Sequence, residues 1–132
     1  MAKKKFSLIH IHTIKFVFNH LFKSTVDMFK ETGVYKVDLS HFNMKEVIYT
    51  NFMFDYSTLL ESINLKNINL ENVIEMSNMF RYCKNLKSVD LAYFSTPKLR
   101  DVNNLFYACD SLTEIKNFNM NTKNVKDFHC MF

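Results

Sequence analysis

VIEMSNMFRYCKNLKSVDL, the stretch at residues 73–91, decides the fold because its pattern returns along most of the chain. Its centre is an apolar residue followed by Phe, and this pair occurs five times. The pairs are Met28-Phe29, Met53-Phe54, Met79-Phe80, Leu105-Phe106 and Met131-Phe132, with Phe spacings of 25, 26, 26 and 26 residues. Self-similarity at a fixed period of this length is the signature of stacked repeats.

Other apolar positions keep the same phase between the Phe residues. The columns, in order after each Phe, are Leu60, Leu86 and Leu112; Ile63, Val89 and Ile115; Leu65 and Leu91; Ile68, Phe94 and Met120; Val73, Leu99 and Val125; and Met76, Val102 and Phe128. Asn117 breaks the second Leu column in the last unit. The first unit runs one residue early, which indicates a one-residue deletion near Thr32-Gly33.

Each unit reads as a strand, a loop and a helical turn. Residues 86–91 alternate apolar and polar side chains, as in a short half-buried strand. Apolar residues of 99–106 are spaced i, i+3, i+6 and i+7, which predicts one face of a helix, and Thr96-Pro97 would begin it. One unit cannot bury its apolar face alone, so the units must stack and their strands pair in parallel. We therefore predict an α/β, leucine-rich-repeat-like solenoid over residues 26–132, with about four 26-residue coils.

The same columns resemble a known family, the BspA-like leucine-rich-repeat proteins, and among them the mycoplasma-type surface-protein repeat. That repeat runs V-x-x-M-x-x-M-F-x-x-C-x-x-L-x-x-I-x-L-x-x-F, and residues 73–91 carry nearly all of it. The resemblance covers residues 26–132. It implies recognition or adhesion at a cell surface and offers no catalytic residues. The family usually has Gly before the Cys, where this chain has Tyr56, Tyr82 and Ala108.

Glycine is scarce in a chain that must turn many times. The 132 residues include one Gly and one Pro, beside 14 Phe and 8 Met, and 48% are hydrophobic. That apolar fraction excludes a disordered chain. Turns with positive φ favour Gly, so we expect Asn, Asp and Ser to take its place.

Positive charge gathers at the N-terminus. Residues 1–30 hold six Lys against one Asp, whereas residues 31–132 hold eleven Lys and Arg against twelve Asp and Glu. The repeats thus lack the net basic charge of a nucleic-acid binder. Residues 1–25 form a basic segment whose apolar spacing predicts a capping helix, unless it lies on an anionic surface. They show no signal peptide and no membrane span, so the localisation stays open although the resemblance suggests a cell surface.

Cysteines and histidines give no clear site for chemistry. Three cysteines are no disulfide framework, and their spacing fits no zinc pattern. Cys83 and Cys109 share a column with Ser57, so they are either small buried thiols or a bonded pair in neighbouring coils. His10, His12 and His20 could form a metal site only with further ligands, and His41 and His129 lie in or beside repeat columns. We expect no metal, no cofactor and no catalytic residue.

The candidate binding face is the solvent side of the strand stack. Repeat proteins often bind there because its side chains vary without touching the core. The candidates are Lys36, Asp38, Ser40, Ser62, Asn64, Lys66, Ser88, Asp90, Ala92, Glu114, Lys116 and Phe118. Phe118 is its one aromatic residue and a candidate anchor. The plain alternative is an ordinary solvated sheet face.

Three hypotheses about function follow. The first is a protein-interaction module that binds a protein or cell-surface ligand. The second is a truncated part of a longer array with no independent activity, since nothing in the sequence covers the coil that closes at Met131-Phe132. That uncovered coil also predicts self-association. The third hypothesis, an enzyme with a His or Cys site, would require activity or a bound metal to be lost on mutating His10 and His12.

Overall fold

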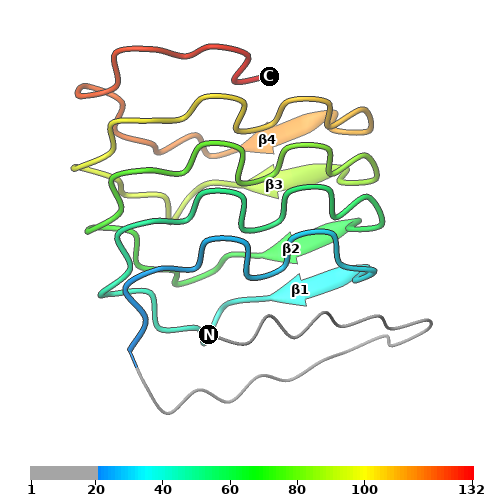
Figure 1. Ribbon diagram of the computed structural model, residues 1–132, viewed down its shortest axis with the longest axis horizontal. Coiled ribbons are helices and arrows are strands. Elements are labelled where there is room, and N and C mark those ends of the chain that lie inside the picture. The colour runs from blue at the N-terminus through cyan, green and yellow to red at the C-terminus, as the bar shows by residue number, and fades with distance from the viewer. Residues whose placement is uncertain (1–20) are drawn as a thin grey trace.

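Residues 21–132 are described by a computed structural model, in which successive repeat units lie one above another as layers (Figure 1). Four three-residue strands lie along one side: β1 Lys36–Asp38, β2 Ser62–Asn64, β3 Ser88–Asp90 and β4 Glu114–Lys116. β1 pairs with β2 and β3 with β4, both in parallel, and β2 also packs against β3. β1 and β3 each pair with residues 26 positions later, as Lys36 with Ser62 and Ser88 with Glu114, so one layer equals one sequence repeat.

The fold class predicted from the sequence, an α/β leucine-rich-repeat-like solenoid with helical turns, is wrong. Within residues 21–132 there is no helix, and the regular structure consists of the four short strands in two small sheets. Where a helix was expected, over residues 99–106, the chain passes through an isolated bridge at Asp101 and then forms consecutive turns from Asn103 onward. Leu99, Val102 and Leu105 are buried as predicted, but a different backbone buries them.

Residues with positive φ explain why these segments are not helical. Asn104 (φ 55°) and Ala108 (φ 56°) are in the left-handed region, which a right-handed helix does not contain. Hydrogen bonds from N–H of residue i+3 to C=O of residue i close the turns, as from Leu105 to Val102 and from Tyr107 to Asn104. Such turns recur within each unit and place apolar side chains three or four residues apart, a spacing that a helix shares.

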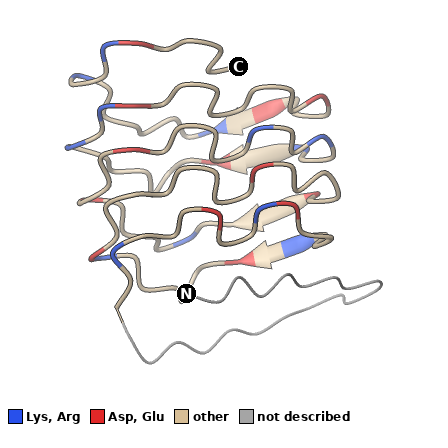
Figure 2. Cartoon of the chain, in the orientation of Figure 1, with Lys and Arg blue, Asp and Glu red and all other residues tan. Residues whose placement is uncertain are grey.

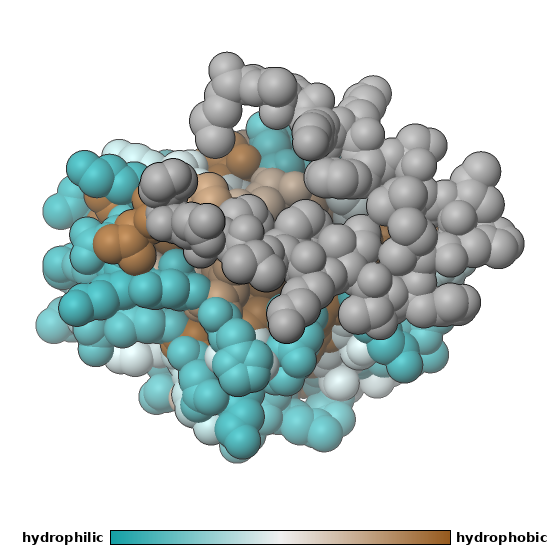
Figure 3. Space-filling model, turned by 90° about the horizontal axis from the view of Figure 1, so that it is seen from below, coloured by the Kyte–Doolittle hydropathy of each residue, from teal (hydrophilic) through white to brown (hydrophobic). Residues whose placement is uncertain are grey.

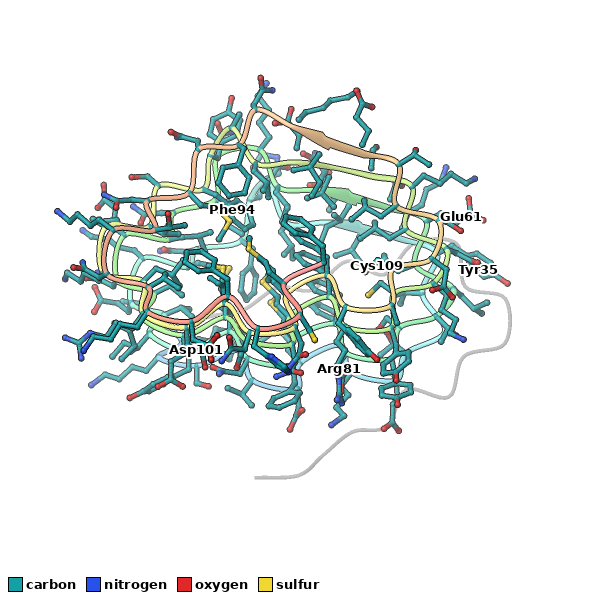
Figure 4. All side chains as sticks on the ribbon, turned by 90° about the horizontal axis from the view of Figure 1, so that it is seen from above. Tyr35, Glu61, Arg81, Phe94, Asp101 and Cys109 are labelled. Carbon is teal, nitrogen blue, oxygen red and sulfur yellow. The ribbon has the colours of Figure 1, made fainter. Side chains whose placement is uncertain are left out.

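The turn segments also form a hydrogen-bond ladder between layers. We call the segments 49–56, 75–82 and 101–107 the turn face. Every second N–H donates to the next layer, as from Phe52 to Ser77 O (3.1 Å) and from Phe54 to Met79 O (2.8 Å). The same bonds recur one layer higher, for example from Phe80 to Leu105 O (3.0 Å). The layers are thus joined by backbone bonds on two opposite sides, the strands and the turn face (Figure 4).

Asn and Asp replace glycine in only some of the turns. The positive-φ residues are Asp27, Glu31, Phe52, Tyr56, Asn67, Asn78, Tyr82, Asn104, Ala108, Asn117 and Cys130, and Gly33 is not among them. Asn and Asp tolerate this region, as expected, but the predicted Ser does not occur there. Tyr56, Tyr82 and Ala108 stand where the resemblance leads one to expect Gly, and each has a φ of 56–59°.

A column of stacked phenylalanine rings runs through the core from layer to layer. Phe29, Phe54, Phe80, Phe106 and Phe132 stack in sequence, with centroids 5.1–5.9 Å apart and rings within 10° of parallel. Phe94 is fully buried from the other side of the layer (Figure 4). Removing one central ring of this kind costs about 3–5 kcal/mol. Phe128 departs from its predicted core column, since 47% of its surface is exposed.

The predicted one-residue deletion in the first unit is confirmed. Glu31 N–H bonds to Asp55 O, 24 residues later, whereas equivalent bonds in later layers span 25, as from Tyr56 to Arg81 O. From Lys36 onward the strand register is the common 26. The missing residue therefore lies between Glu31 and Lys36, at the corner that contains Thr32-Gly33.

The capping helix predicted within residues 1–25 falls mainly on residues 1–20, outside the described residues, and stays a prediction. Ser24 forms an isolated parallel bridge with Tyr49, so the layered pattern has begun by that residue. The described part of the end nearest β1 has hydrophobic surface near its middle and hydrophilic surface along its border (Figure 3).

Candidate functional site

The strand face, defined by the twelve predicted residues, forms three columns across the layers. Repeat spacing places them as Lys36, Ser62, Ser88 and Glu114; Asp38, Asn64, Asp90 and Lys116; and Ser40, Lys66, Ala92 and Phe118. All twelve are exposed or half-buried. The two sheets bring Lys36 beside Ser62 and Asp90 beside Lys116.

The middle column of the strand face is engaged by the fold itself. The side-chain oxygens of Asp38, Asn64 and Asp90 accept the N–H two residues later, at 2.8, 3.1 and 2.9 Å. Such side-chain turns end a strand without glycine. The hydrogen bond with Ser40 lowers the pKa of Asp38, and the one with Asn117 lowers that of Asp90. These carboxylates and amides are therefore partly occupied before any ligand arrives.

A second group of polar and aromatic residues lies on the turn face. We call it the arginine–tyrosine cluster, and its members are Lys30, Phe52, Asp55, Tyr56, Arg81, Tyr82 and Tyr107. At its centre the fully buried side chain of Asp55 accepts two bonds from Arg81, at Nε (2.8 Å) and Nη2 (3.0 Å). Lys30 Nζ lies 3.5 Å from Asp55 Oδ2, the oxygen that also accepts from Arg81 Nη2. Arg81 projects from the side of the molecule opposite the strands (Figure 4).

Aromatic rings surround the Arg81 guanidinium. Its carbon lies 5.8 Å from the ring centre of Phe52, 5.4 Å from that of Tyr56 and 5.6 Å from that of Tyr82. Tyr56 and Tyr82 stack at 4.3 Å, and Tyr107 meets Tyr82 edge-on at 5.6 Å. Tyr56 and Tyr107 nevertheless keep 41% and 39% of their surface exposed. The cluster thus offers several rings to solvent around a fixed cation.

The Asp55–Arg81 pair holds the guanidinium in one orientation. Bidentate bonding fixes its plane, and the hydrogen bond with Asp55 raises the pKa of Arg81. Burying a carboxylate costs free energy that apolar residues in the same volume would not cost. Stability alone therefore gives a weak reason for this pair, whereas positioning Arg81 among the rings gives a direct one.

Sequence reasoning missed this cluster, although two signals were present. Lys30, Asp55 and Arg81 each follow a repeat Phe, so their column alternates in charge from layer to layer. Tyr56 and Tyr82 stand where glycine was expected, and an aromatic side chain there must point away from the apolar columns. Charge and ring patterns within columns would have located the site, had they been compared as the apolar columns were.

Cysteines on the inner edge of the turn face act as hydrogen-bond donors. Ser57 Oγ donates to Phe29 O (2.6 Å), Cys83 Sγ to Phe54 O (3.2 Å) and Cys109 Sγ to Phe80 O (3.0 Å). Both thiols are free. Burial raises the pKa of Cys83, and it raises that of Cys109 to about 12. The arrangement is that of a column of small buried donors, one of the two alternatives left open by the sequence.

The described residues show no group of three potential metal ligands. His10, His12 and His20 lie outside residues 21–132. His129 is exposed, with its Nε2 3.5 Å from Cys130 Sγ, and His41 is exposed at the corner after β1. Between residues 21 and 132 no helix is present that is long and apolar enough for a bilayer.

The layers, the short parallel strands and the turn face define a turn-rich repeat protein. Over residues 23–132 the chain matches the family described as "Mycoplasma protein of unknown function, DUF285", and it belongs to that family. The match is consistent with the mycoplasma-type repeat, whereas the BspA-like leucine-rich-repeat assignment gains no support from it. No curated protein and no solved structure gives a significant match.

Proposed function

We propose that this chain is a protein-recognition module and that it binds its partner through the arginine–tyrosine cluster. The observation that carries the proposal is a half-exposed Arg81, fixed by the buried Asp55 and ringed by partly exposed tyrosines. Tyr and Arg are the residue types enriched among the side chains that dominate protein interfaces.

Rigidity supports the turn face over the strand face as the binding surface. Side chains that are already ordered lose little conformational freedom on binding, which favours affinity. In the cluster, stacking and bidentate bonding order Tyr56, Tyr82 and Arg81 in advance. On the strand face, the middle column is engaged by its own turns, and Phe118 is the single aromatic side chain.

The double variant Tyr56→Gly/Tyr82→Gly tests the proposal with little expected damage to folding. Both residues have positive φ, so Gly relieves about 1–2 kcal/mol of backbone cost per site, which offsets the lost ring contacts. Peptides would be selected from a random phage-displayed library on the unmodified chain, and their Kd measured by fluorescence anisotropy. We expect the double variant to weaken binding at least about tenfold, the loss of one good aromatic contact.

The matched control is Lys36→Ala/Lys66→Ala on the strand face, which should leave the same Kd values nearly unchanged. The opposite pattern, loss in the control and retention in the tyrosine variant, would return the binding site to the strand face. Selection that enriches no peptide above an unrelated immobilised protein would count against a recognition module altogether.

A narrower form of the proposal is adhesion or recognition at a cell surface, the role that the resemblance suggests. Treating intact cells with a protease and following the chain by antibody tests it. Digestion without cell lysis supports display at the surface. Complete protection, with digestion after lysis, would instead place the recognition function elsewhere.

A further inference from the structure

A second feature lies at the corner where the turn face begins in the upper layers. An open hollow of about 630 Å³ is lined by Ile74, Pro97, Lys98, Arg100, Asn124 and Lys126. Ile74 and Pro97 give it apolar wall, and three of the six residues are cations. Lys and Arg segments follow one another along this corner in the two highest layers (Figure 2).

The three cations have no carboxylate partner within the described part of the chain. Six ion pairs occur there, and none includes Lys98, Arg100 or Lys126. Lys98 Nζ is held by a neutral group instead, Asn72 Oδ1 at 2.6 Å. The hollow therefore gathers positive charge that forms no ion pair with a carboxylate of residues 21–132.

This corner departs from the charge pattern elsewhere between layers. Asp55 lies between Lys30 and Arg81, and Lys87 contacts Glu61 one layer below at 3.4 Å. Arg100 and Lys126, by contrast, occupy the same repeat position in adjoining layers, whose backbones are spaced about 5 Å apart along the stack. Two like charges on neighbouring layers repel, and an anion between them would relieve the repulsion.

Acidic residues next in sequence do not fill the hollow. Asp101 Oδ1 accepts the N–H of Asn103 (2.9 Å), and Asp127 Oδ1 accepts the N–H of His129 (2.9 Å). Glu75 Oε2, in the same column as Asp101, accepts a bond from Asn51 Nδ2 (3.3 Å). These carboxylates serve the turn face, and none of them lines the hollow.

We propose that this hollow binds a small oxyanion of the phosphate or sulfate type, either free or as an ester on a larger molecule. A planar guanidinium bonds two oxygens of such a group at once, and lysines add point charge. In this assignment Arg100 supplies the bidentate contact and Lys98 and Lys126 flank it. The side-chain amide of Asn124 is engaged with Pro97 O (3.1 Å) and shapes the wall.

Titration of the ¹⁵N-labelled chain, followed by NMR, tests the site. The probes are sodium sulfate, sodium phosphate and O-phosphoserine, each compared with sodium chloride at matched ionic strength, since screening alone alters surface charges. We expect saturable shifts at Lys98, Arg100 and Lys126 with the oxyanions and none with chloride. A tighter response to O-phosphoserine than to inorganic phosphate would identify an ester as the ligand.

Arg100→Gln should weaken the binding about tenfold, as expected for losing one charged hydrogen-bonding group. The matched control Lys36→Gln removes one positive charge on the strand face and should leave the affinity unchanged. Equal weakening by both variants would overturn the proposal, because it would reflect net charge alone. Non-saturating shifts that chloride reproduces would overturn it too, as would binding to phosphatidylserine vesicles with no response to any small oxyanion.

Discussion

The strand face and the turn face perform the same structural task by different means. Both join neighbouring layers through backbone hydrogen bonds. On the strand face the backbone is completed by side chains at the ends of β1, β2 and β3, where Asp38, Asn64 and Asp90 accept an N–H. On the turn face the consecutive turns around Asp55 and Arg81 satisfy the backbone there, so these two side chains remain available for each other, although Asp101 still completes a turn with its own side chain.

This difference shows where a repeat of this kind has room for function. A polar side chain that completes a turn cannot change without cost, even when it is exposed. A side chain beside a self-sufficient turn can vary, provided that its φ is tolerated. Exposure alone is therefore a poor guide to the binding surface, and the hydrogen-bond partners of each exposed residue are a better one.

The largest expected effect is a difference in reactivity among the three cysteines, two of which lie on the inner edge of the turn face. With the pKa of Cys109 raised from 9.0 to about 12, its thiolate is roughly a thousandfold scarcer at pH 8 than that of an unshifted thiol. We expect exposed Cys130 to react first with Ellman's reagent, then Cys109, with buried Cys83 reacting only as the chain unfolds. Mass mapping of the labelled peptides gives the order, and fast labelling of Cys83 in the native chain would contradict it.

Of the single substitutions that break an ion pair, removal of the buried Asp55 carboxylate should lower the free energy of unfolding most. Asp55→Ala leaves Arg81 without its bidentate partner and should lower the free energy of unfolding by about 3 kcal/mol. Glu61→Ala, which breaks the exposed pair with Lys87, should cost less than about 1 kcal/mol. Urea unfolding of both variants measures the contrast, and equal costs would show that burial does not distinguish the two pairs.

Two Ala→Gly changes should move stability in opposite directions. Ala108 has a φ of 56°, so Ala108→Gly relieves left-handed strain and should stabilise the chain by about 1 kcal/mol. Ala92, on the strand face, is not among the positive-φ residues, and Ala92→Gly should destabilise by about 0.5–1 kcal/mol. Thermal unfolding of the pair checks the sign. Destabilisation by both changes would mean that the turn at Ala108 gains nothing from glycine.

The smallest expected effect is a change in how the stability of the chain depends on pH in acid. The folded pKa values of Asp38 and Asp90 lie below the ordinary 3.8, so their contribution to stability is present above that value and is lost as the pH falls through the folded pKa. Asn64 forms the same turn without a charge. Asp38→Asn/Asp90→Asn removes both ionisations, so the variant should lose less stability than the unmodified chain as the pH falls below 3.8. A steeper acid loss in the variant would contradict this sign.

Much of the layered arrangement could be predicted, because apolar residues that recur at the same position of each repeat mark the equivalent positions of successive layers. Columns such as Val89 and Ile115 located the strands, and the early shift of Val37 located the missing residue at the corner after Glu31. The helix was not excluded, because the spacing of Leu99, Val102 and Leu105 is common to a helix and to consecutive turns. The distinction depends on the sign of φ at Asn104, inside that segment, which the apolar spacing does not reveal.

The candidate site was less predictable than the fold. Repeat spacing placed the strand-face residues in their columns, but did not show that Asp38 and Asp90 are engaged by the backbone. The arginine–tyrosine cluster depends on pairing between layers, so Arg81 meets Asp55 across 26 residues. Whether the chain is part of a longer array, and whether it self-associates at its last layer, stay predictions.

Backbone bonds between layers also give the molecule a direction-dependent response to force. They run along the stack on both sides, from one layer to the next. Tension along that axis would load the bonds of one interface at a time and peel the layers apart in sequence. Tension across a layer would load the strands and turns of several interfaces together and meet greater resistance. The same fold is therefore compliant lengthwise and stiff crosswise, a property that optical tweezers would register as a series of small steps in one pulling geometry and a single large one in the other.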